Sequence, residues 1–341
     1  MVNEYTFDMS LSRILTITLS VFCILFTVFV GAEKIGEEKQ FTKPVEYKGV
    51  LNLWHIETFE GGHGSRKQFL LDVASSFEKE NDGVLVMVIS HTENSANEAL
   101  NSGEKPDMIS YGAGTIYTDV KEINNVHSFI GGMVEEKSYA IPWCKGGYVL
   151  FENPKYNDKT SRQKSVMVSK SIKNLPLLNL CLKEDLVVSD MVNVKTPLDA
   201  YVEFVNGKHK YFLGTQRDVV RFSNRGFNVE SKVLTEFNDL YQYISLSSDD
   251  EIKTIYSEKF INHLLSEKIQ KKLYKISMFS EFYDNEYQND TLNLMQNIKP
   301  KYTISAFSSP QLVDDLNALS EEYLNGEKSV LSKIKNVLIL P

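Results

Sequence analysis

Short apolar runs alternate with amphipathic segments from residue 49 onward. Residues 49–54 read as a buried strand, a polar glycine-rich loop follows, and apolar positions at helical spacing from Arg66 predict a helix. A second strand is predicted at residues 84–89, a short helix at 96–101 and a third strand at 107–111. This βαβαβ order predicts a parallel sheet that helices cover on both faces, with right-handed crossovers.

The rest of the chain continues the mixed pattern. The segment Ser138–Phe151 is apolar but contains Pro142 and a Gly146-Gly147 pair, so it predicts one bent strand. The Leu-rich stretch at residues 174–188 fits a helix or a strand. The remaining predictions are a helix from Pro197, a strand at 210–214, a strand at 240–246, a helix from Asp249, and two closing helices around residues 312–319 and 330–337.

Three polar loops follow predicted strands and are candidates for one binding site. In open α/β sheets, ligands bind beyond the carboxyl ends of the strands, where helix N-termini offer unpaired N–H donors. The loops after residues 54, 111 and 214 would share that edge. The candidate ligand-binding residues on or beside these loops are Trp54, Glu57, Arg66, Tyr111, Trp143, Gln216, Arg217 and Asp218.

Several of these residues also have purely structural interpretations. Trp54 and Trp143 can stack on a planar ligand or lie in the core. Arg66 begins a helix, where a cation opposes the helix dipole, so a functional or ion-paired role must offset that cost. Arg217 and Asp218 either contact a ligand or pair with each other.

A metal site or a catalytic site in the first loop is the less favoured interpretation. His55, Glu57, Glu60 and His63 are possible ligand types, but no helical His-Glu-x-x-His pattern is present, so we expect no metal and no cofactor. Glu57 and Glu60 also supply the two carboxylates that a glycosidase needs. An extracellular glycoside hydrolase is therefore one alternative function.

Composition limits the class of partner. The 341 residues are 42% hydrophobic with a formal net charge of −8, which suits a folded chain of two domains. The absence of a dense Lys/Arg cluster argues against nucleic acid as a partner. A small solute is compatible with this composition.

The N-terminus predicts export. Residues 1–32 contain an apolar run after Arg13 that ends with Val30 and Ala32 at the spacing of a signal-peptidase site, but the run is also long enough to be a membrane anchor. Phe22 precedes Cys23 where a lipoprotein signal requires a small residue. Residues 33–45 read as a linker. We expect an extracellular or cell-envelope location.

Cys144 and Cys181 lie outside the apolar run. An oxidising compartment would permit them to pair, and the alternative is two unpaired buried thiols.

The order of several motifs resembles one family. Gly103–Asp107 reads Gly-x-x-Pro-Asp, AIPWCKGGYVLFEN spans residues 140–153, Phe204–Lys208 has the form Phe-x-x-Gly-Lys, and FINHLLSEKIQKKL begins at Phe260. Together they are similar to the extracellular solute-binding proteins of ABC importers, in particular the carbohydrate-type group with a periplasmic-binding-protein-like type II fold. The resemblance extends over most of the exported chain.

The resemblance implies an α/β, two-lobed type II fold with a central ligand cleft and hinge crossings near Trp143 and Tyr243. Residues 46–142 and 247–300 would form the first α/β lobe, and residues 143–246 and 301–341 the second. Hinge closure would capture the solute. The chain departs from the group's pattern between residues 153 and 196, where the second lobe looks short.

The implied function is a monomeric, non-catalytic receptor that delivers a small polar solute to an ABC permease in the membrane. Gln216 and Arg217 stand where sugar binders often place an aromatic side chain, so the solute can be a sugar, a polyol or an anion. A membrane-anchored sensory or structural envelope module is the second alternative.

Overall fold

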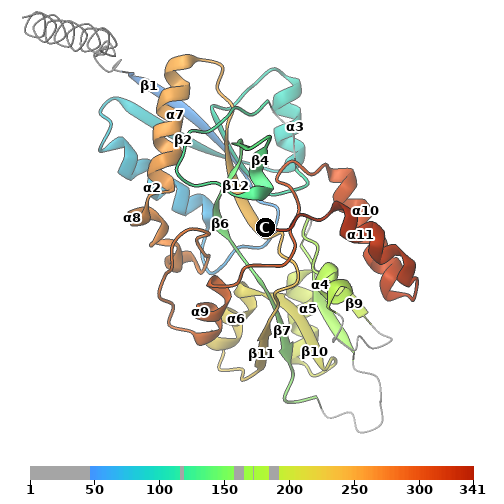
Figure 1. Ribbon diagram of the computed structural model, residues 1–341. Coiled ribbons are helices and arrows are strands. Elements are labelled where there is room, and N and C mark those ends of the chain that lie inside the picture. The colour runs from blue at the N-terminus through green and yellow to red at the C-terminus, as the bar shows by residue number, and fades with distance from the viewer. Residues whose placement is uncertain (1–46, 116–118, 157–164, 172, 184–191) are drawn as a thin grey trace, which may run out of the picture. The chain divides into compact units, whose positions relative to one another are not determined.

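A computed structural model describes residues 47–115, 119–156, 165–171, 173–183 and 192–341 (Figure 1). The predicted signal or anchor segment, the linker and Cys23 lie outside these residues. Within the described ranges, no helix combines the length and the apolar character needed to cross a bilayer.

The first sheet confirms the predicted βαβαβ unit. β1 pairs in parallel with both β2 and β3, while β12 pairs antiparallel with β3 and β6. In spatial order, the five strands are β2 (Val84–His91), β1 (Gly49–Ile56), β3 (Met108–Tyr111), β12 (Tyr241–Leu246) and β6 (Ile141–Lys145). We call the part of the chain built on this sheet the first lobe.

The second sheet forms the second lobe. β10 pairs antiparallel with β7 and in parallel with β8. In spatial order, its strands are β11 (Glu230–Val233), β7 (Tyr148–Glu152), β10 (Tyr211–Thr215), β8 (Val166–Ser169) and β9 (Val192–Lys195). A separate small hairpin is formed by β4 (Met133–Val134) and β5 (Lys137–Ser138).

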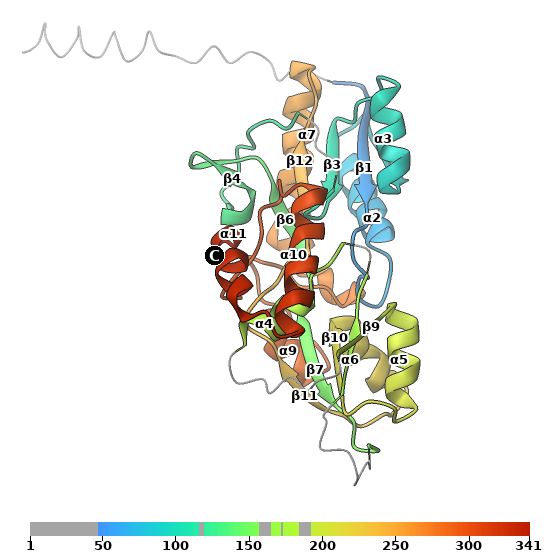
Figure 2. The same cartoon turned by 90° about the vertical axis from the view of Figure 1, so that its right-hand side faces the viewer.

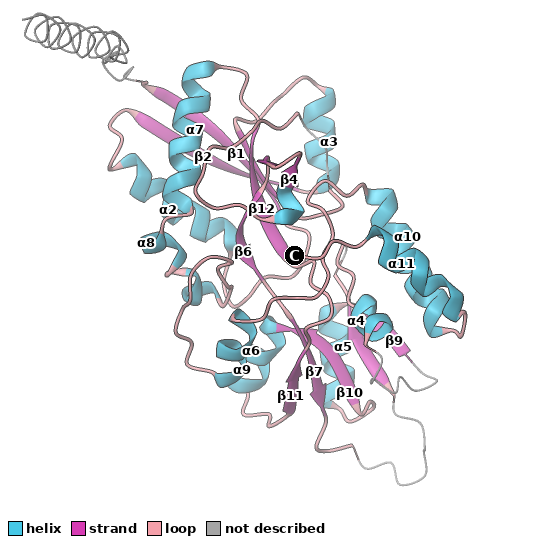
Figure 3. Cartoon of the chain, in the orientation of Figure 1, coloured by secondary structure: helices cyan, strands magenta, loops and turns pink. Residues whose placement is uncertain are grey.

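The helices surround these sheets (Figure 3). Two of them begin at Arg66 and Pro197, as the sequence predicted, and the Leu-rich stretch that fitted a helix or a strand forms the helix α4. The α-helices are α2 (Arg66–Glu78), α3 (Glu93–Asn101), α4 (Leu177–Leu182), α5 (Pro197–Val205), α6 (Gln216–Asn224), α7 (Glu251–Leu264), α8 (Glu267–Gln270), α9 (Asp290–Gln296), α10 (Pro310–Leu324) and α11 (Leu331–Val337). The 3₁₀ turns are η1 (Ile130–Gly132), η2 (Leu273–Ile276) and η3 (Lys328–Val330).

Alternation along the strands explains how the faces are covered. On β1, Leu51 and Leu53 join a core with α2 and α7, whereas Trp54 and Ile56 join a second cluster on the opposite face near α3. Phe212 on β10 packs with α5 and α6, and its neighbour Leu213 belongs to the same large core as Leu51 and Leu53, which also includes α4 and α10. α10 in turn packs on α4 and α11 (Figure 2). Each sheet is therefore apolar on both sides.

The segment Ser138–Phe151 is not one bent strand. Its two halves, β6 and β7, lie in different sheets, and the Gly146-Gly147 pair joins them (Figure 1). A Cβ atom on Gly146 would lie 2.7 Å from Oε1 of Gln216, so a side chain at this crossing would have to displace the Gln216 amide. The apolar pattern correctly predicted strand content but could not reveal the change of sheet.

A second correction concerns the strand at residues 240–246. The sequence places these residues in the second lobe, but β12 pairs with β3 and β6 of the first sheet. A continuous apolar run shows burial on both faces without showing which sheet it joins. The chain thus returns from β11 to the first sheet between residues 233 and 241. Residues 143–145, also assigned to the second lobe, belong to β6 of the first sheet, and α9, assigned to the first lobe, packs on α6 and β11 of the second. The other predicted lobe boundaries stay predictions.

Both cysteines of the described chain are free and buried. Burial raises the pKa of each thiol, Cys144 and Cys181, to about 12. Of the two interpretations that the sequence left open, the structure has the unpaired thiols.

We predict that neither thiol reacts under native conditions, because the thiolate is the reactive form and burial suppresses it. Iodoacetamide labelling at pH 8 followed by peptide mass mapping should find Cys144 and Cys181 unmodified in native protein and modified in guanidinium chloride. A Cys144–Cys181 linked peptide in the unreduced digest would contradict this prediction.

Candidate functional site

The loop after β1 is fixed by one close backbone approach. A Cβ atom on Gly62 would lie 1.9 Å from the carbonyl oxygen of Ile276 and 2.5 Å from that of Ser277. The Gly62 N–H points to Sδ of Met278 at 3.1 Å. The loop then enters α2 through Ser65, whose side chain accepts a hydrogen bond from the backbone N–H of Gln68. Gly62 therefore seats the loop against the segment around η2.

Arg66 also fixes this loop, through its contacts with Phe59. Its residue exposure is only 1%, and its Nη1 donates to Oε1 of Gln242 at 2.9 Å, while Nη2 donates to the carbonyl oxygen of Phe59. The guanidinium carbon lies 4.3 Å from the centre of the Phe59 ring. Glu57 Oε1 lies 3.6 Å from Arg66 Nε. Burial lowers the pKa of Arg66, but arginine keeps its proton at neutral pH.

Gln242 on β12 connects four strands of the first sheet. Its Nε2 donates to the carbonyl oxygen of Ile56 at 2.9 Å and to Oγ of Ser110 at 3.1 Å. Nε1 of Trp143 donates to the same Ser110 hydroxyl at 2.9 Å, and Nδ1 of His55 lies 3.1 Å from it. We call Arg66, Gln242, Ser110, His55 and Trp143 the buried polar network. It crosslinks β1, β3, β6 and β12 next to the predicted binding loop.

Glu57 lies at the edge of this network with its side chain 52% exposed. Oε1 of Glu57 is 3.3 Å from Nε2 of His55, and this hydrogen bond, aided by Arg66, lowers the pKa of Glu57 to about 2. Burial lowers the pKa of His55. The lowered pKa favours the ionised carboxylate of Glu57 at neutral pH, whereas a general acid must carry a proton.

The three aromatic candidates lie in the core. Trp54 packs on His91 with ring centres 4.5 Å apart, and Trp143 stacks on Phe69 at 5.7 Å. The hydroxyl of Tyr111 lies 3.0 Å from Oγ of Ser245. All three are at most 4% exposed. Their contact with a ligand stays a prediction.

In the second lobe, the N-terminal turn of α6 is held by its own polar residues. The Thr215 hydroxyl and the Asp218 carboxylate form a capping box, with the Thr215 N–H donating to Oδ2 of Asp218 at 3.0 Å. Oε1 of Gln216 accepts from the N–H of Gly147 at 3.0 Å. Gln216 and Asp218 are both buried. Burial raises the pKa of Asp218 to about 6.

Arg217 does not pair with Asp218, which was one of the two interpretations of the sequence. Its Nε lies 2.9 Å from Oε1 of Glu60, and its Nη1 donates to the carbonyl oxygen of Gly62 at 3.3 Å. Asp218 instead binds Arg221, whose Nη1 lies 3.0 Å from Oδ1. Arg217 thus points across to the loop of the first lobe.

Glu60 connects the lobes. Oε1 of Glu60 also lies 2.7 Å from Nη2 of Arg221, and the Glu60 backbone N–H donates to Oγ of Ser171 at 3.2 Å. We call Glu60, Arg217 and Arg221 the inter-lobe ion cluster. A second inter-lobe pair joins Lys173 Nζ to Oε2 of Glu93 at 3.6 Å.

The sequence reasoning missed Arg221 and Ser171 and considered Glu60 only for metal or catalytic roles. The spacing of four residues between Arg217 and Arg221 places both guanidiniums on one helix face, and this signal could have identified the second arginine.

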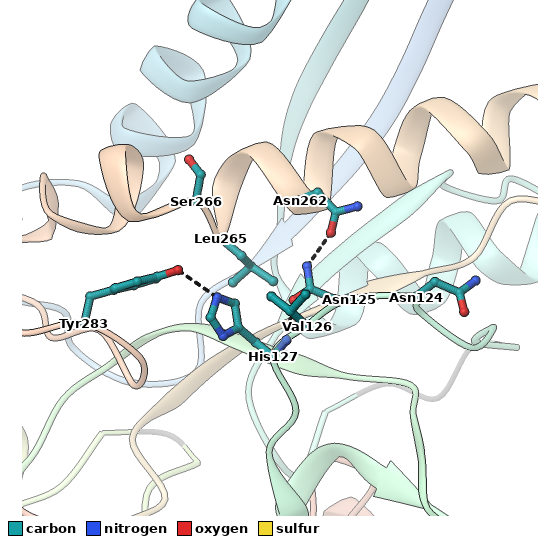
Figure 4. Close-up of a pocket in the computed structure, with 8 residues that line it drawn as sticks. All are labelled: Asn124, Asn125, Val126, His127, Asn262, Leu265, Ser266 and Tyr283. Carbon is teal, nitrogen blue, oxygen red and sulfur yellow. Dashed lines mark hydrogen bonds between the residues drawn. The ribbon is translucent and has the colours of Figure 1, made fainter. Parts of the chain in front are cut away.

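A hollow of about 580 Å³ lies away from the inter-lobe ion cluster, between the chain after residue 123 and the end of α7 (Figure 4). Its polar side chains bond to one another: Asn125 to Asn262, and Nε2 of His127 to the hydroxyl of Tyr283 at 3.0 Å. Burial lowers the pKa of His127. Asn124, Val126, Leu265 and Ser266 complete the lining. The lining carries no Asp, Glu, Lys or Arg.

The described ranges contain no group of three or more His, Cys, Asp or Glu side chains placed to hold a metal ion.

No family model matches the chain, and no curated protein matches it. Solved structures do. The sugar-binding protein MalE from Xanthomonas citri is 13% identical with a TM-score of 0.55, and the match covers 85% of this chain and 96% of that one. The GacH receptor of Streptomyces glaucescens, solved unliganded and with acarbose, is 14% identical with a TM-score of 0.52 over 86% of this chain and 97% of that one.

A cyclo/maltodextrin-binding protein in complex with maltotetraose gives a TM-score of 0.50 at 12% identity, covering 85% of this chain and 96% of that one. At these identities the likeness establishes the fold. The chain has the two-lobed, periplasmic-binding-protein-like type II fold that the sequence predicted.

We predict that Gly62→Ala lowers the free energy of unfolding by about 1–3 kcal/mol, because the added methyl group would collide with backbone that cannot swing away. Gly61→Ala is the matched control, since its Cβ would meet nothing nearer than Arg66 Nε at 3.4 Å. It should stay within about 0.5 kcal/mol of wild type. Urea denaturation measures both, and equal midpoints for the two variants would contradict the proposed seating of the loop.

Proposed function

We propose that the protein is an exported, non-catalytic receptor that closes on a small polar solute and presents it to an ABC permease. One observation carries the proposal: charged side chains from the loop after β1 and from α6 meet where strands of the two lobes end. In α/β folds this is the edge at which ligands bind. The similarity in fold to sugar-binding proteins and to a receptor for acarbose supports the same role.

The proposed ligand contacts are the exposed charges of this edge. Glu57 is 52% exposed and Arg217 is 36% exposed at the side chain, so both can reach a solute. Arg66, Trp143, Gln216 and Asp218 are buried and would hold the contacting loops in place. Trp54 and Tyr111 would add ring contacts only where the lobes open enough to uncover them.

Closure would occur at the two crossings between the lobes. The Gly146-Gly147 pair and the segment between β11 and β12 are the short connections that would absorb a rotation. Export would follow from residues 1–32, either by cleavage or as an anchor, and the receptor would act as a monomer outside the cytoplasm. The solute class in this proposal is a sugar, a polyol or an anion.

The hydrolase alternative fits the geometry poorly. A glycosidase needs one carboxyl group that keeps its proton near neutral pH. The hydrogen bond from His55, aided by Arg66, lowers the pKa of Glu57 to about 2, and the Glu60 carboxylate is engaged by Arg217 and Arg221. An anchored sensory or structural module would share the fold. A receptor differs from such a module because it retains and releases a solute.

We predict that native mass spectrometry of freshly purified protein detects a retained small polar molecule, released unchanged on denaturation. Titrated back by calorimetry, that molecule should bind Arg217→Ala about tenfold to a hundredfold more weakly, a loss of roughly 1.5–3 kcal/mol for a charge-assisted contact. Arg225→Ala is the control, because Arg225 lies at the far end of α6 beside Tyr201. Equal affinity in both variants and wild type, or recovery of a hydrolysed product, would contradict the proposal.

A further inference from the structure

We infer that Arg217 and Arg221 form an anion site that Glu60 fills from the opposite lobe, and that a solute bearing a carboxylate or phosphate group binds by displacing Glu60. The inference rests on the proposed function and deepens it, since it names the chemical class that the receptor takes.

The geometry is that of a bound anion. Oε1 of Glu60 contacts both guanidinium groups: Nε of Arg217 lies 2.9 Å away and Nη2 of Arg221 lies 2.7 Å away. Such short charge-assisted contacts are typical of the way arginines hold carboxylates and phosphates. The two cations lie one helical turn apart on α6, whereas the anion arrives from the loop after β1. Glu60 thus has the position that a solute anion would take.

The local charges favour an anion there. Arg217 and Arg221 contribute two positive charges, and the only other carboxylate bonded to either guanidinium among the described residues is Asp218, on Arg221. Asp218 is fully buried and also accepts the Thr215 N–H, so it is committed to the helix cap. Without Glu60, Arg217 would face the inter-lobe space without a carboxylate partner. Repulsion between the two guanidiniums then favours any anion of suitable size.

Glu60 is held weakly enough to be displaced. The three side chains of the inter-lobe ion cluster are 21–36% exposed, so water reaches these ion pairs and weakens them. The loop does not depend on the Glu60 carboxylate for its position, because Gly62 and Arg66 anchor it independently. The tethered Glu60 carboxylate acts as an intramolecular competitor. The apparent affinity for an outside anion is therefore the intrinsic affinity multiplied by the fraction of molecules in which Glu60 leaves the site empty.

The test is to remove the internal competitor and supply a simple anion. Inorganic phosphate is titrated by calorimetry, in a phosphate-free buffer at low salt, into wild type, Glu60→Gln, and the control Asp72→Asn. Asp72→Asn removes the same charge from an exposed position on α2 and so controls for net charge. We expect Glu60→Gln to bind phosphate at least tenfold more tightly than wild type and Asp72→Asn to match wild type. The double variant Glu60→Gln/Arg221→Gln should lose the gain.

The outcomes separate this inference from the proposed function. Equal phosphate affinity in wild type, Glu60→Gln and Asp72→Asn would overturn the anion site, as would a gain that survives in the double variant. A neutral sugar retained by the native protein, together with no gain in Glu60→Gln, would leave the receptor role standing and remove the inference. A gain in Glu60→Gln with no retained or titratable solute in wild type would support the anion site and count against the receptor role.

Discussion

The buried guanidinium of Arg66 fixes the part of the structure on which the candidate site depends. A cation at the first position of a helix opposes the helix dipole, and burial adds a desolvation cost. Hydrogen bonds to Gln242 and Phe59 and the nearby Glu57 carboxylate offset these costs. Through Gln242 the network reaches four strands, so the loop after β1 has one position relative to the first sheet. The fixed loop presents Glu60 to the second lobe, where its Oε1 lies 2.9 Å from Nε of Arg217 and 2.7 Å from Nη2 of Arg221.

The contacts that α6 makes with that loop are charged. The capping box of α6 and the contact of Gln216 with Gly147 hold the helix start, and from it Arg217 and Arg221 extend to Glu60 on the loop of the first lobe. A glycine pair joins β6 to β7, and a short segment joins β11 to β12. Partly exposed ion pairs are weak and reversible, which is the property that a receptor needs if it is to open, exchange solute and close again.

Local structure was predictable from the sequence, and long-range pairing was not. Apolar periodicity predicted β1, α2 and the strand–helix junction before Arg217, because these features depend on neighbouring residues. Arg217 pairs with Glu60, which lies 157 residues away in the chain, and not with its neighbour Asp218. No local sequence pattern encodes this pairing. The predictions for β12 and for residues 138–151 were wrong for the same reason, because the sheet that a strand joins depends on long-range pairing. The buried aromatic candidates show that ring type alone does not separate a ligand platform from a core residue.

We propose that the two lobes move about these crossings under the control of a solute. Spin labels at Leu85→Cys on β2 and Leu198→Cys on α5 report it directly, since both side chains are exposed, at 55% and 65%, and Cys144 and Cys181 are buried. Cys23 is replaced by serine. Pulsed electron paramagnetic resonance should give two inter-lobe distances without solute and one distance, the shorter, with saturating solute recovered from the native protein. A single unchanged distance under both conditions would contradict the account.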